Sequence, residues 1–342
     1  MNLLSQLFNF SGLMRTGNEL QAQNNISDDE LDKAIEHVVD GVYPKIRYYP
    51  GYKKILKDSV LNTLNYIIDL VDSIPGPLLV SKQSFSEDPL IRSYFSTISI
   101  MQEVFSNSTE LKSFFSEPVN CDLDEAYAMV CIDEAEKIVF GMELREDVVL
   151  RDVRQNILSF SDHKVLSPAA SELEVRNAVK QCIFDGLITH ALQKILEVEE
   201  KKQGLETQRC LLNSKLKERQ SHGGGLSQLL VSASQNKNVE TIEKQLLDNE
   251  KKLEELPECW DAPRYYLDMI NETLKQPEQF IRMTIKSFNI SKTGVVKTNN
   301  SSEISHTIHF NEILIANVLQ RVVAVVRYPR NEMLDSQEFC LK

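Results

Sequence analysis

Residues 136–144, EKIVFGMEL, mark the point where the pattern of this chain changes from helical to extended. Apolar residues stand at every second position from Ile138 to Leu144, which is the period-two pattern of a β-strand. REDVV, residues 145–149, carries a turn, and a return strand follows over about 153–160. Because two strands alone are unstable, we expect this hairpin to join further strands or to lie under helices.

The C-terminal part of the chain supplies those further strands. Three stretches rich in β-branched residues are joined by the turn-forming sequences SKTG and TNNSS and by a short link near Asn317. They are FIRMTIKSFNI (280–290), EISHTIHFNEILI (303–315) and RVVAVVRYP (321–329). We expect an antiparallel meander that pairs with the central hairpin in one sheet.

The region before the hairpin reads as helical. Ser27 and Glu30 form a capping-box pattern, and prolines at 75 and 77 end a second helical run over 52–72. Further helices are expected at 88–106, 108–116 and 122–131. The sequence thus predicts a helical domain over 27–131.

Residues 171–256 form the longest helical pattern, interrupted by the glycine-rich stretch HGGGLSQ. Its second half has an apolar seam at 3-4 spacing, broken only by Asn249. The seam residues are Val239, Ile242, Leu246, Leu253 and Leu256. Two such stretches around a flexible loop predict an antiparallel, coiled-coil-like helical hairpin, either packed on its own chain or docking to a partner.

The fold class predicted is α+β, with the helical hairpin inserted between two contributions to one antiparallel sheet. A helical stripe with almost no basic residues on its polar side favours a packing or partner-docking helix over a membrane-surface anchor; its residues are Leu3, Leu7, Phe10 and Met14. The expected domains are a 1–26 amphipathic segment with linker, the 27–131 helical domain, a 132–170 β-hairpin, the 171–256 arm, and a 257–342 helix with strands.

Composition excludes several kinds of function. A net charge of -12 opposes phosphate backbones and anionic lipids, so nucleic acid is an unlikely partner. The 6 cysteines form no C-x-x-C pair, which predicts no zinc site and favours a reducing cytoplasm. The sequence shows no transmembrane segment.

FSDHK, residues 160–164, places a serine, an aspartate and a histidine side by side. Adjacent strand residues point to opposite faces, so these three groups cannot form a hydrolase triad among themselves. No G-x-S-x-G elbow is present either. We expect a strand end and turn here, with Asp162 bonding nearby backbone N–H groups.

His306 and His309 have a spacing that would suit a metal on a helix. Their β-branched neighbours predict a strand, on which the two rings point to opposite faces. No P-loop or dinucleotide fingerprint is present. We therefore expect no metal site and no cofactor, and the sequence identifies no catalytic residue.

The stretch VYPKIRYYPGYKKILK, residues 42–57, combines cations with tyrosines and contains no acid. Such a set could bind a nucleotide or another phosphate. It could equally be a solvated helix face that pairs with the protein's own excess acids. Its candidate ligand-binding residues are Lys45, Arg47, Tyr49, Lys53 and Lys54.

Two functions follow from these patterns. The first is a structural or interaction protein, a scaffold or adaptor, that binds a protein partner or itself through 171–256. The alternative is an anion-binding protein or an enzyme for a phosphorylated small molecule, which would use the 42–57 stretch. Whether the protein is an enzyme is left open by the sequence.

Overall fold

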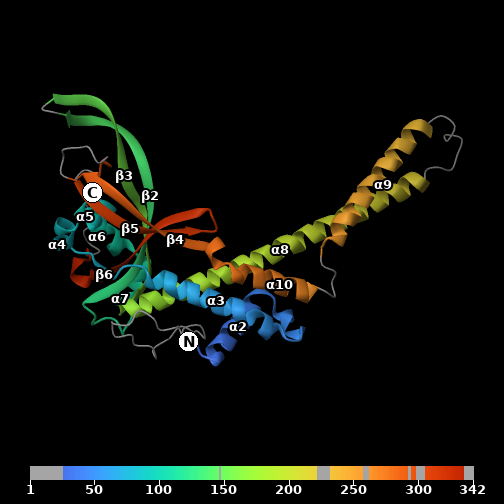
Figure 1. The fold of residues 1–342 in the computed structure, drawn as a ribbon, viewed down its shortest axis with the longest axis horizontal. Helices are drawn as coiled ribbons and strands as arrows, with labels where there is room; N and C mark the ends of the chain where they lie inside the picture. Colours follow the sequence, from blue (N-terminus) through green and yellow to red (C-terminus); the bar gives the residue numbers. More distant parts are fainter. Residues whose placement is uncertain are drawn as a thin grey trace. The chain divides into compact units, whose positions relative to one another are not determined.

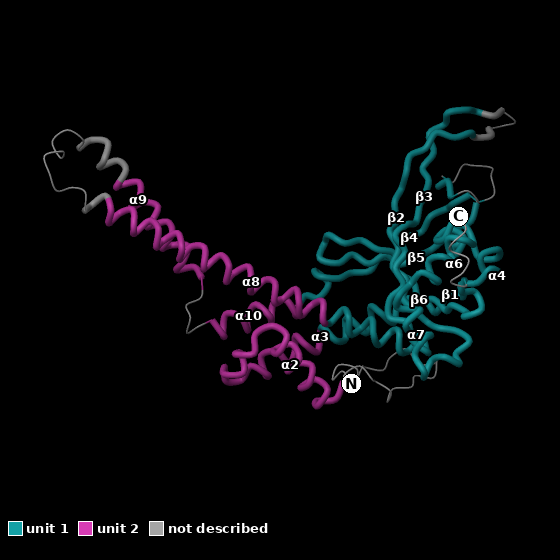
Figure 2. The backbone as a smooth tube through the Cα atoms, turned by 180° about the vertical axis from the view of Figure 1, so that it is seen from behind, with its two compact units in different colours: residues 1–24, 63–184, 276–342 teal, residues 25–62, 185–275 magenta. Residues whose placement is uncertain are grey.

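The computed structural model describes residues 26–145, 148–221, 232–256, 262–291, 294–297 and 305–334. The N-terminal amphipathic segment and the glycine-rich stretch of the arm lie outside the described residues. The fold is α+β, as the sequence predicts (Figure 1). The chain forms two compact units (Figure 2): unit 1 comprises 1–24, 63–184 and 276–342, and unit 2 comprises 25–62 and 185–275.

Unit 1 is built on a six-stranded sheet of order β3-β2-β6-β5-β4, with the short β1 parallel to β6. The strands are β1 Leu78–Leu79, β2 Glu125–Arg145, β3 Val148–Ala169, β4 Ile281–Ser291, β5 Ser305–Ile315 and β6 Leu319–Pro329. All pairings along the main path are antiparallel. The predicted joining of hairpin and meander in one sheet is therefore confirmed, through the pairing of β2 with β6.

A short segment, 294–297, bridges the two outer strands of this sheet. On β3, Leu158 N donates to Gly294 O at 3.1 Å, and Val296 N donates to Asn156 O at 2.8 Å. On β4, Ser291 N donates to Val295 O at 2.9 Å. The sheet therefore curls until both edge strands bond to the same segment.

Four helices cover the inner face of the curled sheet: α4 Lys82–Glu87, α5 Pro89–Phe95, α6 Ile98–Asn107 and α7 Thr109–Ser116. The single helix expected over 88–106 is broken where Ser96 adopts a φ of 53°. Aromatic rings fill the core between helices and strands, as in the stack of Phe105 on Tyr328 with centroids 4.3 Å apart. This core fixes the helices on the sheet.

Two local predictions are wrong. Residues 125–131 belong to β2 and not to a helix. Ala126, Ala128 and Val130 are buried, and so is Met129 on the opposite face. With both faces buried, the stretch loses the alternation that marks a strand and resembles a helical run.

FSDHK is also not a strand end, because β3 continues through it to Ala169. The irregularity there is a β-bulge, with Asp162 at a φ of 49° and the register shifted between Cys131 and Asp133 on β2. Bulges of this kind bend a strand without ending it. The Asp162 carboxylate accepts from Arg321 Nη1 at 3.0 Å and lies 3.4 Å from Lys164 Nζ, so its partners are side chains.

Beyond Ile132, β2 has no partner other than β3 among the described strands. The 294–297 segment bonds to β3 as far as Asn156, so residues 139–145 of β2 and 148–155 of β3 form a two-stranded ribbon that extends from the sheet (Figure 1). Ile138, at the base of this ribbon, and Phe140 and Met142 within it are exposed.

Unit 2 is helical. Its described elements are α2 Asp28–Val42, the 3-10 turn η1 Pro44–Tyr48, part of α3 Tyr52–Asp72, part of α8 Glu172–Ser221, α9 Ser232–Glu254 and α10 Ala262–Lys275. The predicted capping box of Ser27 and Glu30 is confirmed at the start of α2. A Cβ on Gly41 would lie 2.6 Å from Ile188 Cγ2, so glycine allows α2 and α8 to approach closely. The predicted helical region 27–131 contributes residues to both units.

Candidate functional site

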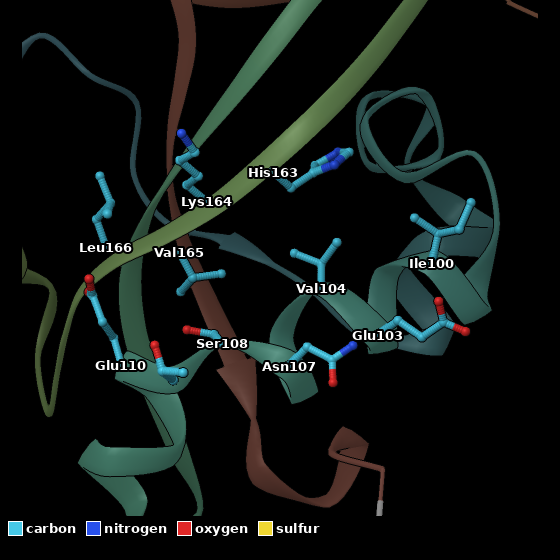
Figure 3. Close-up of a pocket in the computed structure, with 11 residues that line it drawn as sticks. Ile100, Glu103, Val104, Asn107, Ser108, Glu110, His163, Lys164, Val165 and Leu166 are labelled. Carbon is cyan, nitrogen blue, oxygen red and sulfur yellow. The ribbon is translucent and has the colours of Figure 1, made fainter. Parts of the chain in front are cut away.

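The cleft of unit 1 shown in Figure 3 lies between α6, the start of α7 and β3. It is open and encloses about 520 Å³. Ile100, Glu103 and Val104 line it from α6, and His163 and Lys164 line it from β3. Part of the FSDHK sequence therefore lies in a cleft.

The Asp162 bulge places the neighbouring His163 ring against α5. Its Nε2 lies 2.7 Å from the main-chain oxygen of Tyr94, so this nitrogen carries the proton and donates it. The ring stacks on Phe95 with centroids 5.1 Å apart and an interplanar angle of 22°. Burial lowers the pKa of His163, although the Tyr94 carbonyl acts in the opposite direction.

The other polar groups of the cleft are mostly engaged in holding the fold. Glu110 Oε2 accepts from Ser167 N at 3.0 Å, and Ser108 Oγ accepts from Leu111 N at 3.2 Å as the cap of α7. Within the described chain, Ser161, Asp162 and His163 form no hydrogen bonds with one another. Among the described residues that line the cleft, no hydroxyl is hydrogen-bonded to His163, the pairing of nucleophile and base that acyl-transfer chemistry would need.

The cations of residues 42–57 lie beside the acids of α2. Arg47 bonds to Glu36 at 2.9 Å and to Asp40 at 2.6 Å. Lys53 bonds to Asp32 at 3.1 Å and to Glu36 at 3.2 Å. These two candidate ligand-binding residues therefore already have carboxylate partners within unit 2.

Glu36 is the centre of this arrangement. Tyr52 Oη donates to Glu36 Oε1 at 2.6 Å, and this bond, followed by those from Arg47 and Lys53, lowers the pKa of Glu36 against the effect of burial. Glu36 and the neighbouring aspartates of α2 thus neutralise the charges of Arg47 and Lys53 locally. This is the arrangement expected of a solvated face that pairs with the protein's own acids.

The remaining candidates of this stretch lie at its surface. Lys45 is exposed, with Nζ 5.9 Å from the centroid of the Tyr43 ring. Lys54 is exposed on α3, and Tyr49 is half-buried. The structure therefore leaves Lys45 and Lys54 as the candidate cations with no carboxylate partner among the described residues.

The seam residues lie along α9 and just beyond its end, on the side from which Asn249 contacts α8. Ile242 and Leu256 are buried, and Val239, Leu246 and Leu253 are half-buried. Asn249, in phase with them, donates from Nδ2 to Leu205 O at 3.1 Å. The seam therefore holds the hairpin together, and its side chains are not at the outer surface.

His306 and His309 lie on β5, where their spacing places them on opposite faces. His309 Nδ1 lies 2.7 Å from Ser287 Oγ on the neighbouring strand. Across the described chain, no group of three or more His, Cys, Asp or Glu side chains could hold a metal ion. In the same residues, no helix is long and apolar enough to cross a bilayer.

The sequence did not identify the exposed face of the β2–β3 ribbon. The alternation of Ile138, Phe140 and Met142 was visible, but it predicts a face buried in the sheet. Phe140 is instead 72% exposed. The buried and the uncovered parts of β2 are told apart only by the strand register, in which the pairing of β2 with β6 ends at Ile132.

No protein-family model, curated protein or solved structure matches this chain.

Proposed function

We propose that this protein is an interaction protein, a scaffold or adaptor that binds a protein partner through its α8–α9 hairpin. One observation carries the proposal. The hairpin extends away from α2 and α10 within unit 2 (Figure 2) and is held together by its own seam. Its outer surface is therefore left for contacts with another protein.

The outer surface also carries apolar side chains. Leu211 on α8 is 58% exposed, and Leu247 on α9 is 55% exposed. Ordering each residue of such a hairpin costs about 1–2 kcal/mol of backbone entropy. The hairpin is ordered although it extends away from the other helices of unit 2 (Figure 2), which supports a role outside the fold itself.

The experiment compares capture by three forms of the full chain from source lysate. The first is the natural sequence, the second combines Leu211→Asp with Leu247→Asp, and the third is Leu173→Asp. Leu173 is a matched control because it lies on the same helix, is 56% exposed and belongs to unit 1. Circular dichroism and thermal unfolding confirm that each form is folded.

We expect a partner that the natural chain and Leu173→Asp retain and the double variant loses. Self-association, measured by sedimentation velocity, should follow the same pattern if the partner is a second copy. Equal capture and equal sedimentation by all three forms would overturn the proposal. Variants in the seam are less useful, because a charge at Leu246 or Leu253 would separate the two helices.

The alternative, an anion-binding role for residues 42–57, has less support. Arg47 and Lys53 are engaged by α2 carboxylates, which leaves Lys45 and Lys54 as its cations. For the compartment, the scattered cysteines favour a reducing cytoplasm, and this remains part of the proposal.

A further inference from the structure

A second hollow of unit 1 encloses about 330 Å³ at one end of its core. It lies between α4–α5 and the inner face of the sheet, beside the 294–297 segment that bridges β3 and β4. This volume falls at the lower end of the range for small-molecule sites, about 300–1,000 Å³. It is distinct from the cleft of His163.

The base of this cavity is apolar and partly aromatic. Phe85 comes from α4, Leu158 and Phe160 come from β3, and Ile290 comes from β4. Leu158 and Phe160 also belong to the buried core. The base is therefore rigid and suited to a flat apolar group.

Among the described residues of the polar lining, the charged side chain is the cation Arg92. Arg92 and His306 line the cavity together with several serines, and none of the described residues that line it is an aspartate or glutamate. That set is unusual in a chain with 50 acidic and 38 basic residues. The local field in this cavity therefore favours an anion, although the whole protein is acidic.

Arg92 is held in place without being neutralised. Its Nε donates to Phe85 O at 3.4 Å, and its Nη2 donates to Ser86 O at 2.5 Å. Among the described residues it has no carboxylate partner. A guanidinium has five N–H donors, so the backbone carbonyls orient it and leave donors for a ligand.

His306 stands on β5 opposite Ile290, at the same end of the cavity lining. Its ring has no hydrogen-bond partner within the described chain. An imidazole can donate a hydrogen bond to an anionic oxygen. Two donors from α5 and β5 thus border one apolar cavity.

We propose that this cavity binds a small amphipathic anion, with its carboxylate or phosphate on Arg92 and His306 and its apolar body over Phe85 and Phe160. The proposal is independent of the hairpin and of protein partners. It also differs from the 42–57 stretch, whose main cations are already paired.

The test uses isothermal titration of the full chain with 2-naphthoate, 1-naphthyl phosphate and the uncharged 2-naphthamide. Naphthoate and the phosphate distinguish the two kinds of anion, and the amide has nearly the same shape as naphthoate without the charge. We expect one of the anions to bind about tenfold or more tightly than the amide. Absence of anion binding by the folded chain, or equal binding of the amide, would overturn the proposal.

Three variants localise the binding. Arg92→Gln removes the cation, Ser93→Leu fills the cavity while keeping Arg92, and Arg151→Gln removes an exposed arginine elsewhere in unit 1. We expect Arg92→Gln and Ser93→Leu each to weaken anion binding about tenfold or more, and Arg151→Gln to leave it unchanged. Retained binding in a folded Ser93→Leu variant, judged by its thermal unfolding, would place the ligand elsewhere and refute the assignment.

Discussion

Asn249 donates a hydrogen bond from its side-chain Nδ2 to the main-chain oxygen of Leu205, 3.1 Å away, in the middle of the seam between α9 and α8. A second contact joins the same nitrogen to Gln208 Oε1 at 3.3 Å. Asn249 is only 2% exposed, and its Oδ1 has no hydrogen-bond partner among the described residues. A single polar residue in an apolar seam fixes the register of two helices at a cost in stability.

We predict that Asn249→Leu stabilises the hairpin. Leucine removes a buried unpaired oxygen, which costs about 1–3 kcal/mol, and continues the apolar seam. Thermal unfolding followed by circular dichroism should therefore show a higher Tm. Leu246→Ala, in the same seam, is the control and should lower the Tm because it leaves a gap. A lower Tm for Asn249→Leu would mean that the Leu205 bond outweighs the unpaired oxygen.

A comparison of two adjacent lysines of α3 distinguishes a structural role of residues 42–57 from a ligand-binding role. Lys53 pairs with Asp32 and Glu36, whereas Lys54 has no such partner among the described residues. We predict that Lys53→Glu destabilises the protein by about 1 kcal/mol, and that Lys54→Glu changes stability by less than about 0.5 kcal/mol. Urea unfolding of both variants measures the difference. Equal stabilities of the two variants would argue against the ion pairs of Lys53 with Asp32 and Glu36.

The pairing with α2 has a pH dependence of defined sign. Bonds from Tyr52, Arg47 and Lys53 lower the pKa of Glu36 in the folded protein. The stability that this carboxylate contributes is therefore present above its unfolded pKa, near 4.5, and is lost as the pH falls through its folded pKa. Glu36→Gln should accordingly flatten the acid side of the stability profile, as urea unfolding at pH 3 to 6 can show.

The sequence predicts the main architecture because its strongest signals are local. The capping box of Ser27 and Glu30 and the β-branched runs of β4 to β6 each specify their own element. It fails where burial on both faces removes the alternation, as at Ala126 to Met129. It also fails at Asp162, because a bulge inside a strand and a turn favour the same residues.

The candidate sites were harder to predict because they depend on what lies opposite each residue. The cations of 42–57 were visible in the sequence, but their partners come from α2. The cavity of Arg92 combines α4, α5 and three strands, and its residues are too far apart in the chain to form a motif. The register of strand pairing determines which residues lie opposite one another, and local sequence patterns do not reveal it.

A group of three charges, a half-buried lysine between two buried carboxylates, links β2, β4 and β5. Lys286 Nζ lies 2.7 Å from Glu134 Oε2 and 2.7 Å from Glu312 Oε1, and both glutamate side chains are only 7% exposed. Burial raises the pKa of Glu134, and the neighbouring Glu312 raises it further, against the effect of Lys286. Burial opposes the charge of Lys286, but its bonds to both carboxylates raise its pKa overall.

We predict that Lys286→Met destabilises the protein by about 3–5 kcal/mol near pH 7, because two buried carboxylates would then face each other without a cation. A raised carboxyl pKa contributes stability that is present below the unfolded pKa, near 4.5, and lost as the pH rises through the folded pKa. The free energy of unfolding that Lys286→Met removes should therefore be smaller at pH 4 than at pH 7. Lys112→Met, at an exposed position of α7, is the control. A loss independent of pH would point to packing and not to charge.

The exposed ribbon gives a last prediction, which concerns stability. Ile138 and Phe140 lie beyond the pairing of β2 with β6 and are exposed, so the core of unit 1 gains nothing from them. We expect Ile138→Ser and Phe140→Ser each to change the free energy of unfolding by no more than about 0.5 kcal/mol. Phe105→Ala, at a fully buried ring stacked on Tyr328, should cost about 3–5 kcal/mol. Urea unfolding of the three variants tests the contrast, and a loss above about 1 kcal/mol at Phe140 would show that the ribbon face is covered in solution.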